Sequence, residues 1–159
     1  VPTIKRWISV LEASYIIFLL PPFYENYGKR IIKSPKIYFW DTGLVSYLTG
    51  IETFAQYDKG PMAGAIFENY VVAEINKTYK HRQLSGSLYY FRDSNKHEVD
   101  LIIDQKPQKK LIEIKKSSSF KPQMAKYIEK FLQPGDIGYL LYQGDEFPYK
   151  NNIKVERID

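Results

Sequence analysis

The chain has 159 residues, of which 44% are hydrophobic and 26% are charged, so it can build the core of one globular domain or of two small ones. Lys and Arg number 23 against 18 Asp and Glu, and the net charge of +5 permits an acidic partner such as nucleic acid without requiring one. The absence of cysteine excludes disulfides, zinc–thiolate sites and thiol nucleophiles.

The longest apolar run, residues 15–20, is too short to cross a bilayer, and no signal-peptide pattern is present. We therefore expect a cytoplasmic protein without a membrane segment. The chain begins with Val1 rather than Met, which indicates a piece of a longer protein.

Apolar residues at helical spacing predict an amphipathic helix over residues 4–14, with Thr3 as its N-cap. The next pattern predicts a β-hairpin with arms at 15–25 and 30–41 and a turn at 26–30. A helix followed by a basic hairpin is the order found at the end of a winged-helix module, in which the helix lies in the major groove of DNA.

The basic side chains of this region have two interpretations, a solvated face or a DNA contact, and composition favours the solvated face. They are Lys5, Arg6, Lys29, Arg30, Lys33 and Lys36. We keep four of them as candidate nucleic-acid contacts, namely Lys5, Arg6, Lys29 and Arg30.

Asp41 or Thr42 is the predicted cap of a short helix over residues 43–50, and 51–61 is interpreted as a linker. Residues 1–59 are therefore predicted to be a partial winged-helix segment with its linker, and residues 60–159 a separate α/β domain. The elements predicted in that domain are a helix over 62–79, strands over 87–93, 98–104 and 109–116, a helix over 122–133, and strands over 137–143 and 152–158. This order predicts a mixed sheet flanked by helices.

Carboxylates interrupt the apolar pattern of two of these strands. Glu113 and Lys115 are two residues apart, so they project from the same side of their strand. On the preceding strand, the same rule predicts that Glu98, Asp100 and Ile102 share one face. If the two strands pair, Asp100 lies beside Glu113 at about 5 Å.

Two carboxylates so close together repel each other unless a positive charge lies between them. Mg²⁺, or Mn²⁺ in its place, suits this position because it binds through one or two carboxylates together with waters and substrate phosphate. Lys115 would then hold a phosphate oxygen or position a water. Glu68, on the helix over 62–79, lies on or beside the packed face and would supply a third carboxylate, for a second cation or for an outer-shell water. Glu98 is the alternative to Asp100, at a more solvated place near the end of the strand.

The combination of Glu68, Asp100, Glu113 and Lys115 resembles the PD-(D/E)XK nuclease superfamily. The resemblance implies that Asp100, Glu113 and the backbone carbonyl of Ile114 bind Mg²⁺, and that Lys115 orients or deprotonates the attacking water. It also implies an auxiliary role for Gln123, placed like a helix glutamine of some members. The proline that names the superfamily is absent before Asp100, where this chain has Glu98-Val99.

A wider resemblance covers nearly the whole chain. The segments "PKIYFWDTGLVSYLTG", "GAIFENYVVAEI", "YYFRDSNKHEVDLII" and "LIEIKKS" resemble the C-terminal domain of unknown function that follows the ATPase module of prokaryotic AAA+ ATPases. That resemblance implies that ATP is bound only through an ATPase module missing from this chain. Gly28-Lys29-Arg30 lacks the surroundings of a phosphate-binding loop, so the chain alone is not expected to hydrolyse ATP.

Further lysines surround the end of the central strand and are candidate contacts for a DNA or RNA backbone, with a solvated face as the alternative. They are Lys106, Lys109, Lys110, Lys116 and Lys121. The two histidines, His81 and His97, are expected at the surface, because their spacing is not that of zinc ligands.

Three interpretations of the acidic residues therefore remain open. The first is a nucleic-acid-acting module with metal-dependent phosphodiester hydrolysis. The second is a non-catalytic nuclease fold that binds DNA or regulates its ATPase, in which the acids and Lys115 form a structural network. The third is a protein-interaction or homo-oligomerisation domain with an aromatic docking surface.

Overall fold

Six strands form one mixed sheet in the part of the chain that the computed structural model describes, which comprises residues 2–24, 34–150 and 152–158. The strand order is β3-β4-β5-β6-β8-β7. Pairing is antiparallel from β3 to β5, parallel from β5 through β6 to β8, and antiparallel between β8 and β7. The bounds are β3 Ser87–Arg92, β4 Glu98–Asp104, β5 Lys109–Lys115, β6 Ile137–Tyr142, β7 Phe147–Pro148 and β8 Ile153–Arg157.

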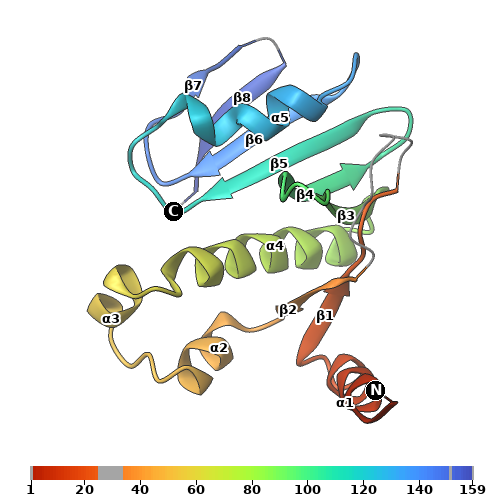
Figure 1. The fold of residues 1–159 in the computed structure, drawn as a ribbon, viewed down its shortest axis with the longest axis vertical. Coiled ribbons are helices and arrows are strands. Elements are labelled where there is room, and N and C mark those ends of the chain that lie inside the picture. The colour runs from red at the N-terminus through yellow and green to blue at the C-terminus, as the bar shows by residue number, and fades with distance from the viewer. Residues whose placement is uncertain (1, 25–33, 151, 159) are drawn as a thin grey trace.

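Helices cover both faces of this sheet, which confirms the predicted mixed α/β architecture. Helix α4 (Ala63–His81) lies between the sheet and a small hairpin made of β1 (Ile17–Leu20) and β2 (Lys36–Phe39), as Figure 1 shows. Helix α5 (Lys126–Phe131) packs on the other face, after the 3₁₀ turn η1 (Pro122–Ala125). The single helix predicted over 122–133 is thus two shorter elements.

The apolar core follows these layers. Val72 of α4 packs with Leu101 of β4 and Ile112 of β5 in one cluster, which also includes Tyr38 of β2. On the opposite face, Ile128 of α5 packs in a second cluster with residues of β4 and β5. The hairpin and the large sheet therefore share a core across α4.

The first helix, α1 (Pro2–Ala13), buries none of its residues. It includes Thr3, so the predicted N-cap role of Thr3 is wrong; proline suits the first helical turn because its ring fixes φ. The hairpin that follows is confirmed by the antiparallel β1–β2 pair, with shorter arms than predicted. Its predicted turn at 26–30 lies outside the described residues.

Two short helices connect the hairpin to α4. Helix α2 (Thr42–Leu48) is capped by Asp41, whose carboxylate accepts from Gly43 N at 2.7 Å. The predicted linker over 51–61 contains helix α3 (Phe54–Lys59), which begins with a reciprocal capping box between Thr53 and Gln56. This helix was not predicted because the capping signal was not recognised. No helix among the described residues is long and apolar enough to span a membrane.

A β-bulge changes the direction of side chains in β4. Tyr89 pairs with Ile102 and Phe91 with Val99, so two residues of β4, Asp100 and Leu101, lie opposite a single residue of β3. The expected strict alternation is therefore wrong: Val99 and Ile102 pack in the cluster of α5, whereas Leu101 packs beneath α4. Asp100 does not share a face with Ile102, because the extra residue shifts the alternation at this point.

Candidate metal centre

Asp100 and Glu113 lie together where the pairing of β4 and β5 ends. The last pairs of the ladder include Leu101 with Ile112, and beyond them Ile114 N donates to Asp100 Oδ2 at 2.8 Å. Each of the two carboxylates is only 5% exposed. The structure thus brings Asp100 beside Glu113 and holds Asp100 through the backbone of the neighbouring strand.

Lys115 joins the two carboxylates. Its Nζ lies 2.6 Å from Glu113 Oε1 and 3.7 Å from Asp100 Oδ2. The second oxygen of Glu113, Oε2, is buried and has no hydrogen-bond partner among the described residues. A buried carboxylate oxygen without a donor is costly, so this atom is a suitable ligand for a cation.

The backbone carbonyl of Ile114 can complete a set of oxygen ligands. The N–H and C=O of one strand residue point to the same side, so the Ile114 carbonyl faces the side of Asp100. Two carboxylates and a carbonyl are oxygen ligands that fit Mg²⁺ or Mn²⁺, with water or phosphate in the remaining positions. No group of three or more acidic or histidine side chains could hold a metal by itself in the described residues, so any cation here depends on this smaller set.

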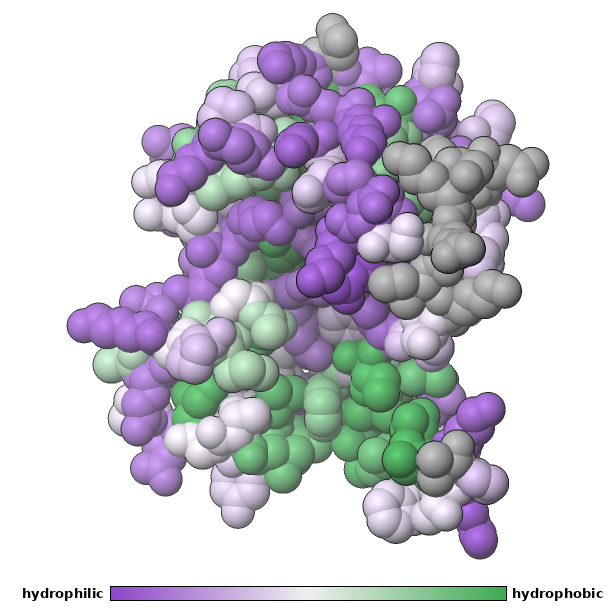
Figure 2. All heavy atoms as spheres, in the orientation of Figure 1, coloured by the Kyte–Doolittle hydropathy of each residue, from purple (hydrophilic) through white to green (hydrophobic). Residues whose placement is uncertain are grey.

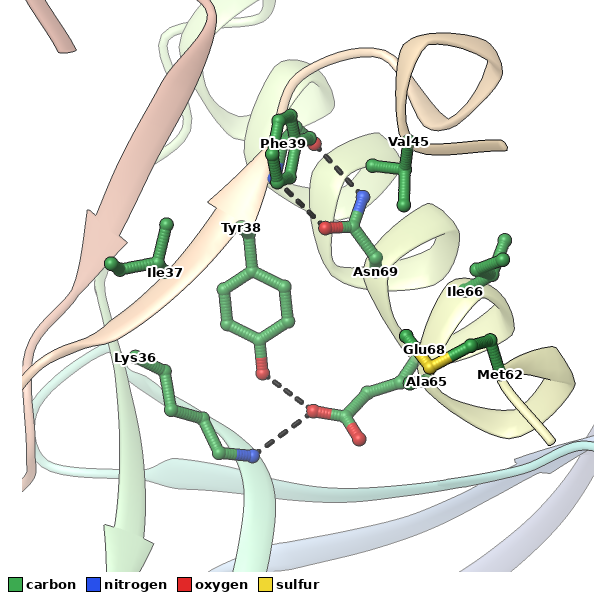
Figure 3. Close-up of a pocket in the computed structure, with 10 residues that line it drawn as sticks. All are labelled: Lys36, Ile37, Tyr38, Phe39, Val45, Met62, Ala65, Ile66, Glu68 and Asn69. Carbon is green, nitrogen blue, oxygen red and sulfur yellow. Dashed lines mark hydrogen bonds and ion pairs between the residues drawn. The ribbon is translucent and has the colours of Figure 1, made fainter. Parts of the chain in front are cut away.

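Glu68 approaches the same region from α4 but has partners from the hairpin. Its Oε1 accepts from Lys36 Nζ at 3.0 Å and from the Tyr38 hydroxyl at 2.6 Å, as Figure 3 shows. Lys36 also pairs with Glu98, which lies 3.3 Å from Arg92 Nε. The expectation that Lys36 belongs to a solvated face is therefore wrong, because it bridges two carboxylates.

A cavity of about 310 Å³ adjoins Glu68, between β2 and α4. Its walls are mostly apolar, and Lys36 and Glu68 point toward each other at one edge of the region drawn in Figure 3. Asn69 anchors β2 on the helix beside this cavity: its side chain accepts from Phe39 N at 2.8 Å and donates to Phe39 O at 2.9 Å. Asn69 therefore helps to position Lys36 and Tyr38.

Burial dominates the electrostatics of the centre. Burial, with Glu68 nearby, raises the pKa of Asp100 to about 6, although Lys115 and Lys36 oppose the rise. Burial and the neighbouring Asp100 raise the pKa of Glu113 to about 8. Burial alone would lower the pKa of Lys36, but the surrounding carboxylates raise it by a larger amount. The pKa of Lys36 therefore lies above its ordinary value, and the side chain stays charged. The metal-free pair of carboxyls thus retains a proton where ordinary carboxyls have lost theirs.

We expect the metal-free protein to lose stability as the pH rises from about 5 to about 8. Both carboxyls have higher pKa values in the folded chain than their ordinary values of 3.8 and 4.5, so the folded state binds more protons in this window. The stability due to this protonation is complete below about pH 4 and is lost as the pH rises through the folded pKa values. Urea unfolding with a chelator present measures the slope. Asp100→Asn with Glu113→Gln should flatten it, and an unchanged slope would contradict the assignment.

The predicted nucleic-acid contacts lie in varied surroundings. Lys5 and Arg6 are exposed on α1, and Lys121 is exposed just before η1. The predicted auxiliary residue Gln123 lies within η1 and is exposed too. Lys110 is half-buried on β5. Lys29 and Arg30 lie outside the described residues.

Two of the predicted contacts already have acidic partners. Lys109 Nζ lies 3.9 Å from Asp136, and Lys116 Nζ lies 2.6 Å from Asp58 Oδ1. A phosphate would have to compete with these carboxylates. Lys109 and Lys116 are therefore weaker candidates than the exposed Lys121.

Sequence reasoning missed the buried acid Asp93, which lies outside the paired carboxylates. It is fully buried and accepts from the backbone N–H groups of Asn95 and His97, each at 2.9 Å, while its Oδ2 lies 2.7 Å from His97 Nδ1. His97 is half-buried against Tyr127 of α5, so it is less exposed than expected, whereas His81 is exposed as expected. The Asp-x-x-x-His spacing in a hairpin turn was the signal that could have revealed this pair.

The fold and the site define a mixed α/β domain with buried carboxylates and a lysine at the ends of two adjacent strands. The chain belongs to the family described as domain of unknown function DUF4143, which residues 63–158 match. Residues 1–55 match a second domain of unknown function, DUF8612. The chain is 29% identical over 160 residues to the uncharacterised proteins Mb2031c of Mycobacterium bovis and Rv2008c of Mycobacterium tuberculosis. The match covers 99% of this chain but 35% of each relative, so the chain spans about a third of their length.

Proposed function

We propose that this chain is the nucleic-acid-acting part of a longer AAA+ ATPase, with a PD-(D/E)XK nuclease-like centre for Mg²⁺-dependent phosphodiester hydrolysis. The buried Glu113 Oε2 is the observation that carries the proposal, because a carboxylate oxygen without a donor suits a cation beside Asp100. The resemblance of Glu68, Asp100, Glu113 and Lys115 to the superfamily supports the type of chemistry.

Each residue of the centre has a distinct task in this proposal. Bound Mg²⁺ or Mn²⁺ would polarise a phosphoryl oxygen and make a bound water more acidic. Asp100 and Glu113 would hold the cation together with the Ile114 carbonyl, and the Ile114 N–H keeps the Asp100 carboxylate in place. Lys115 lies between the two acids and would orient the attacking water or hold a phosphate oxygen.

The N-terminal region would contribute the end of a winged helix. Helix α1 carries Lys5 and Arg6 on its exposed surface and is followed by the β1–β2 hairpin. The relatives are about three times as long as the matched segment, which leaves room for the ATPase module that would bind ATP. An activity on nucleic acid that depends on ATP would belong in the cytoplasm.

We expect labelled DNA or RNA oligonucleotides to bind more weakly as the KCl concentration rises, and to be cut with Mg²⁺ or Mn²⁺ but not with a chelator. Phosphate contacts release counterions, so log K falls linearly with log salt. Lys121→Ala should reduce the magnitude of this slope by about 1, the effect of losing one phosphate contact. Fluorescence anisotropy measures binding, and gel electrophoresis measures cleavage.

Lys77→Ala is the matched control for charge, because Lys77 is ion-paired with Glu74 on α4 and is not a predicted phosphate contact. It should leave the slope unchanged. Salt-dependent binding without cleavage would favour the non-catalytic DNA-binding alternative. Absence of binding would contradict the proposed function.

The exposed apolar surface of α1 favours a second candidate, a protein-interaction or homo-oligomerisation domain. Ile4, Trp7 and Val10 are 54%, 65% and 56% exposed, although apolar residues of a helix usually face a core. In Figure 2, hydrophobic side chains gather over the lower half of the molecule, where α1, α2 and the β1–β2 hairpin lie in Figure 1. Affinity for a partner through this surface would be insensitive to salt.

A further inference from the structure

The ammonium group of Lys36 lies between two carboxylates of the candidate centre. It is 3.0 Å from Glu68 Oε1 and forms a second ion pair with Glu98. It also lies 5.4 Å from the centre of the Tyr90 ring. Glu68 and Glu98 belong to α4 and β4, so a single positive charge joins the helix to the sheet beside Asp100.

The position of Lys36 is set by the backbone of its strand. Asn69 of α4 binds both the N–H and the C=O of Phe39, three residues further along β2. Tyr38, between them, donates to the same Glu68 oxygen that accepts from Lys36. Four hydrogen bonds, made by Lys36, Tyr38 and Phe39, therefore hold β2 against α4 and keep the Lys36 side chain among the acids.

The balance of charge leaves room for one divalent cation. The network contains four carboxylates, Glu68, Glu98, Asp100 and Glu113, which are joined by ion pairs to three basic side chains, Lys36, Arg92 and Lys115. When all four carboxylates are ionised, as ligands of a cation must be, one negative charge is in excess. A cation at Asp100 and Glu113 would reverse the sign of the centre and favour a phosphate, whereas a second cation would have to displace Lys36.

We propose that Lys36 takes the place of a second divalent cation, so that the centre binds one metal ion and β2 supplies the second positive charge. This inference rests on the proposed function, because it assumes the cation at Asp100 and Glu113. Two-metal centres place the second ion about 3.5–4 Å from the first, with carboxylates as ligands. In this chain the Lys36 ammonium, which has three N–H donors, pairs with Glu68 and Glu98, where a second metal ion would otherwise bind. It would also bind a phosphate oxygen of the substrate.

The centre would then combine residues from two family regions. Lys36 and Tyr38 belong to the segment that matches DUF8612, whereas Glu68, Asp100 and Glu113 belong to the segment that matches DUF4143. A displacement of the hairpin from α4 would remove a positive charge from the centre. The substrate phosphate would then meet a site with altered charge.

The number of Mn²⁺ ions bound per chain tests this inference without relying on activity. Electron paramagnetic resonance counts the free Mn²⁺ remaining at each added concentration. We expect one ion for the unmodified chain and two for Lys36→Met, which removes the positive charge and frees Glu68 and Glu98. Lys36→Met combined with Glu68→Gln should return the number to one.

Two control variants should each bind one ion. Lys36→Arg keeps the positive charge at position 36, and Lys116→Met removes a lysine that is paired with Asp58 outside the centre. If Lys36→Met is unfolded by circular dichroism, Glu98→Gln in the unmodified background replaces it and should still bind one ion. The inference would be overturned by any of three results: one ion in the folded Lys36→Met variant, two ions in the unmodified chain, or a loss of Mn²⁺ binding in Glu98→Gln. No binding by the unmodified chain would instead contradict the proposed metal centre itself.

Discussion

Replacing Asp100 by Asn should abolish Mg²⁺-dependent cleavage and weaken Mn²⁺ binding by more than about 100-fold, since loss of even an outer partner of a metal ligand costs 10–100-fold. Asn keeps the size of the side chain and its oxygen can still accept from Ile114 N. Only the charge that holds the cation is removed. Calorimetric titration with Mn²⁺ and a cleavage assay measure the two effects.

The matched control is Asp104→Asn at the other end of β4. Asp104 is half-buried and accepts from Lys106 N, away from the paired carboxylates. We expect this variant to bind Mn²⁺ and to cleave like the unmodified chain. In the metal-free state, Asp100→Asn should also raise the melting temperature, because a buried carboxylate no longer has to be accommodated. Full cleavage by Asp100→Asn would contradict the assignment of this residue as a metal ligand.

Replacing Lys115 by Met should reduce cleavage by about 10²–10⁴-fold, the usual contribution of a positioned acid–base group. Cation binding should be kept or strengthened, since removal of the ammonium frees Glu113 Oε1, which lies 2.6 Å from it. Loss of cleavage with retained Mn²⁺ binding would show that Lys115 acts on the substrate or the water. Loss of both would indicate a purely structural role. Cleavage and Mn²⁺ titration on the same preparation measure both.

Lys116→Met serves as the control for Lys115→Met, because it removes the adjacent lysine, whose partner is Asp58 outside the centre. It should retain most of the cleavage at low salt. If Lys115→Met loses Mn²⁺ binding together with activity, Lys115 supports the two carboxylates structurally. That result would favour the non-catalytic interpretation.

Local patterns were sufficient to predict most of the elements. Alternation and turn residues predicted β3, β4 and β5 within one residue of their ends, and periodicity predicted α4 within two. The proximity of Asp100 and Glu113 could also be predicted, because paired neighbouring strands lie about 5 Å apart.

Features that depend on distant contacts could not be predicted in this way. Lys36 was interpreted as a solvated residue because its carboxylate partners are more than thirty positions away in the sequence. The bulge at Asp100 and Leu101 has no glycine or proline to indicate it, and it results from the register between β3 and β4. The buried Asp93 likewise depends on the turn that brings His97 back to it.

Calorimetric titration with Mg²⁺ and Mn²⁺ tests the metal centre most directly, with and without a short phosphorothioate oligonucleotide to complete the coordination. The unmodified chain is compared with Asp100→Ala combined with Glu113→Ala. We expect one cation per unmodified chain and none in the double variant. Equal binding by both chains, or no binding by the unmodified chain even with the oligonucleotide, would contradict a metal centre at Asp100 and Glu113.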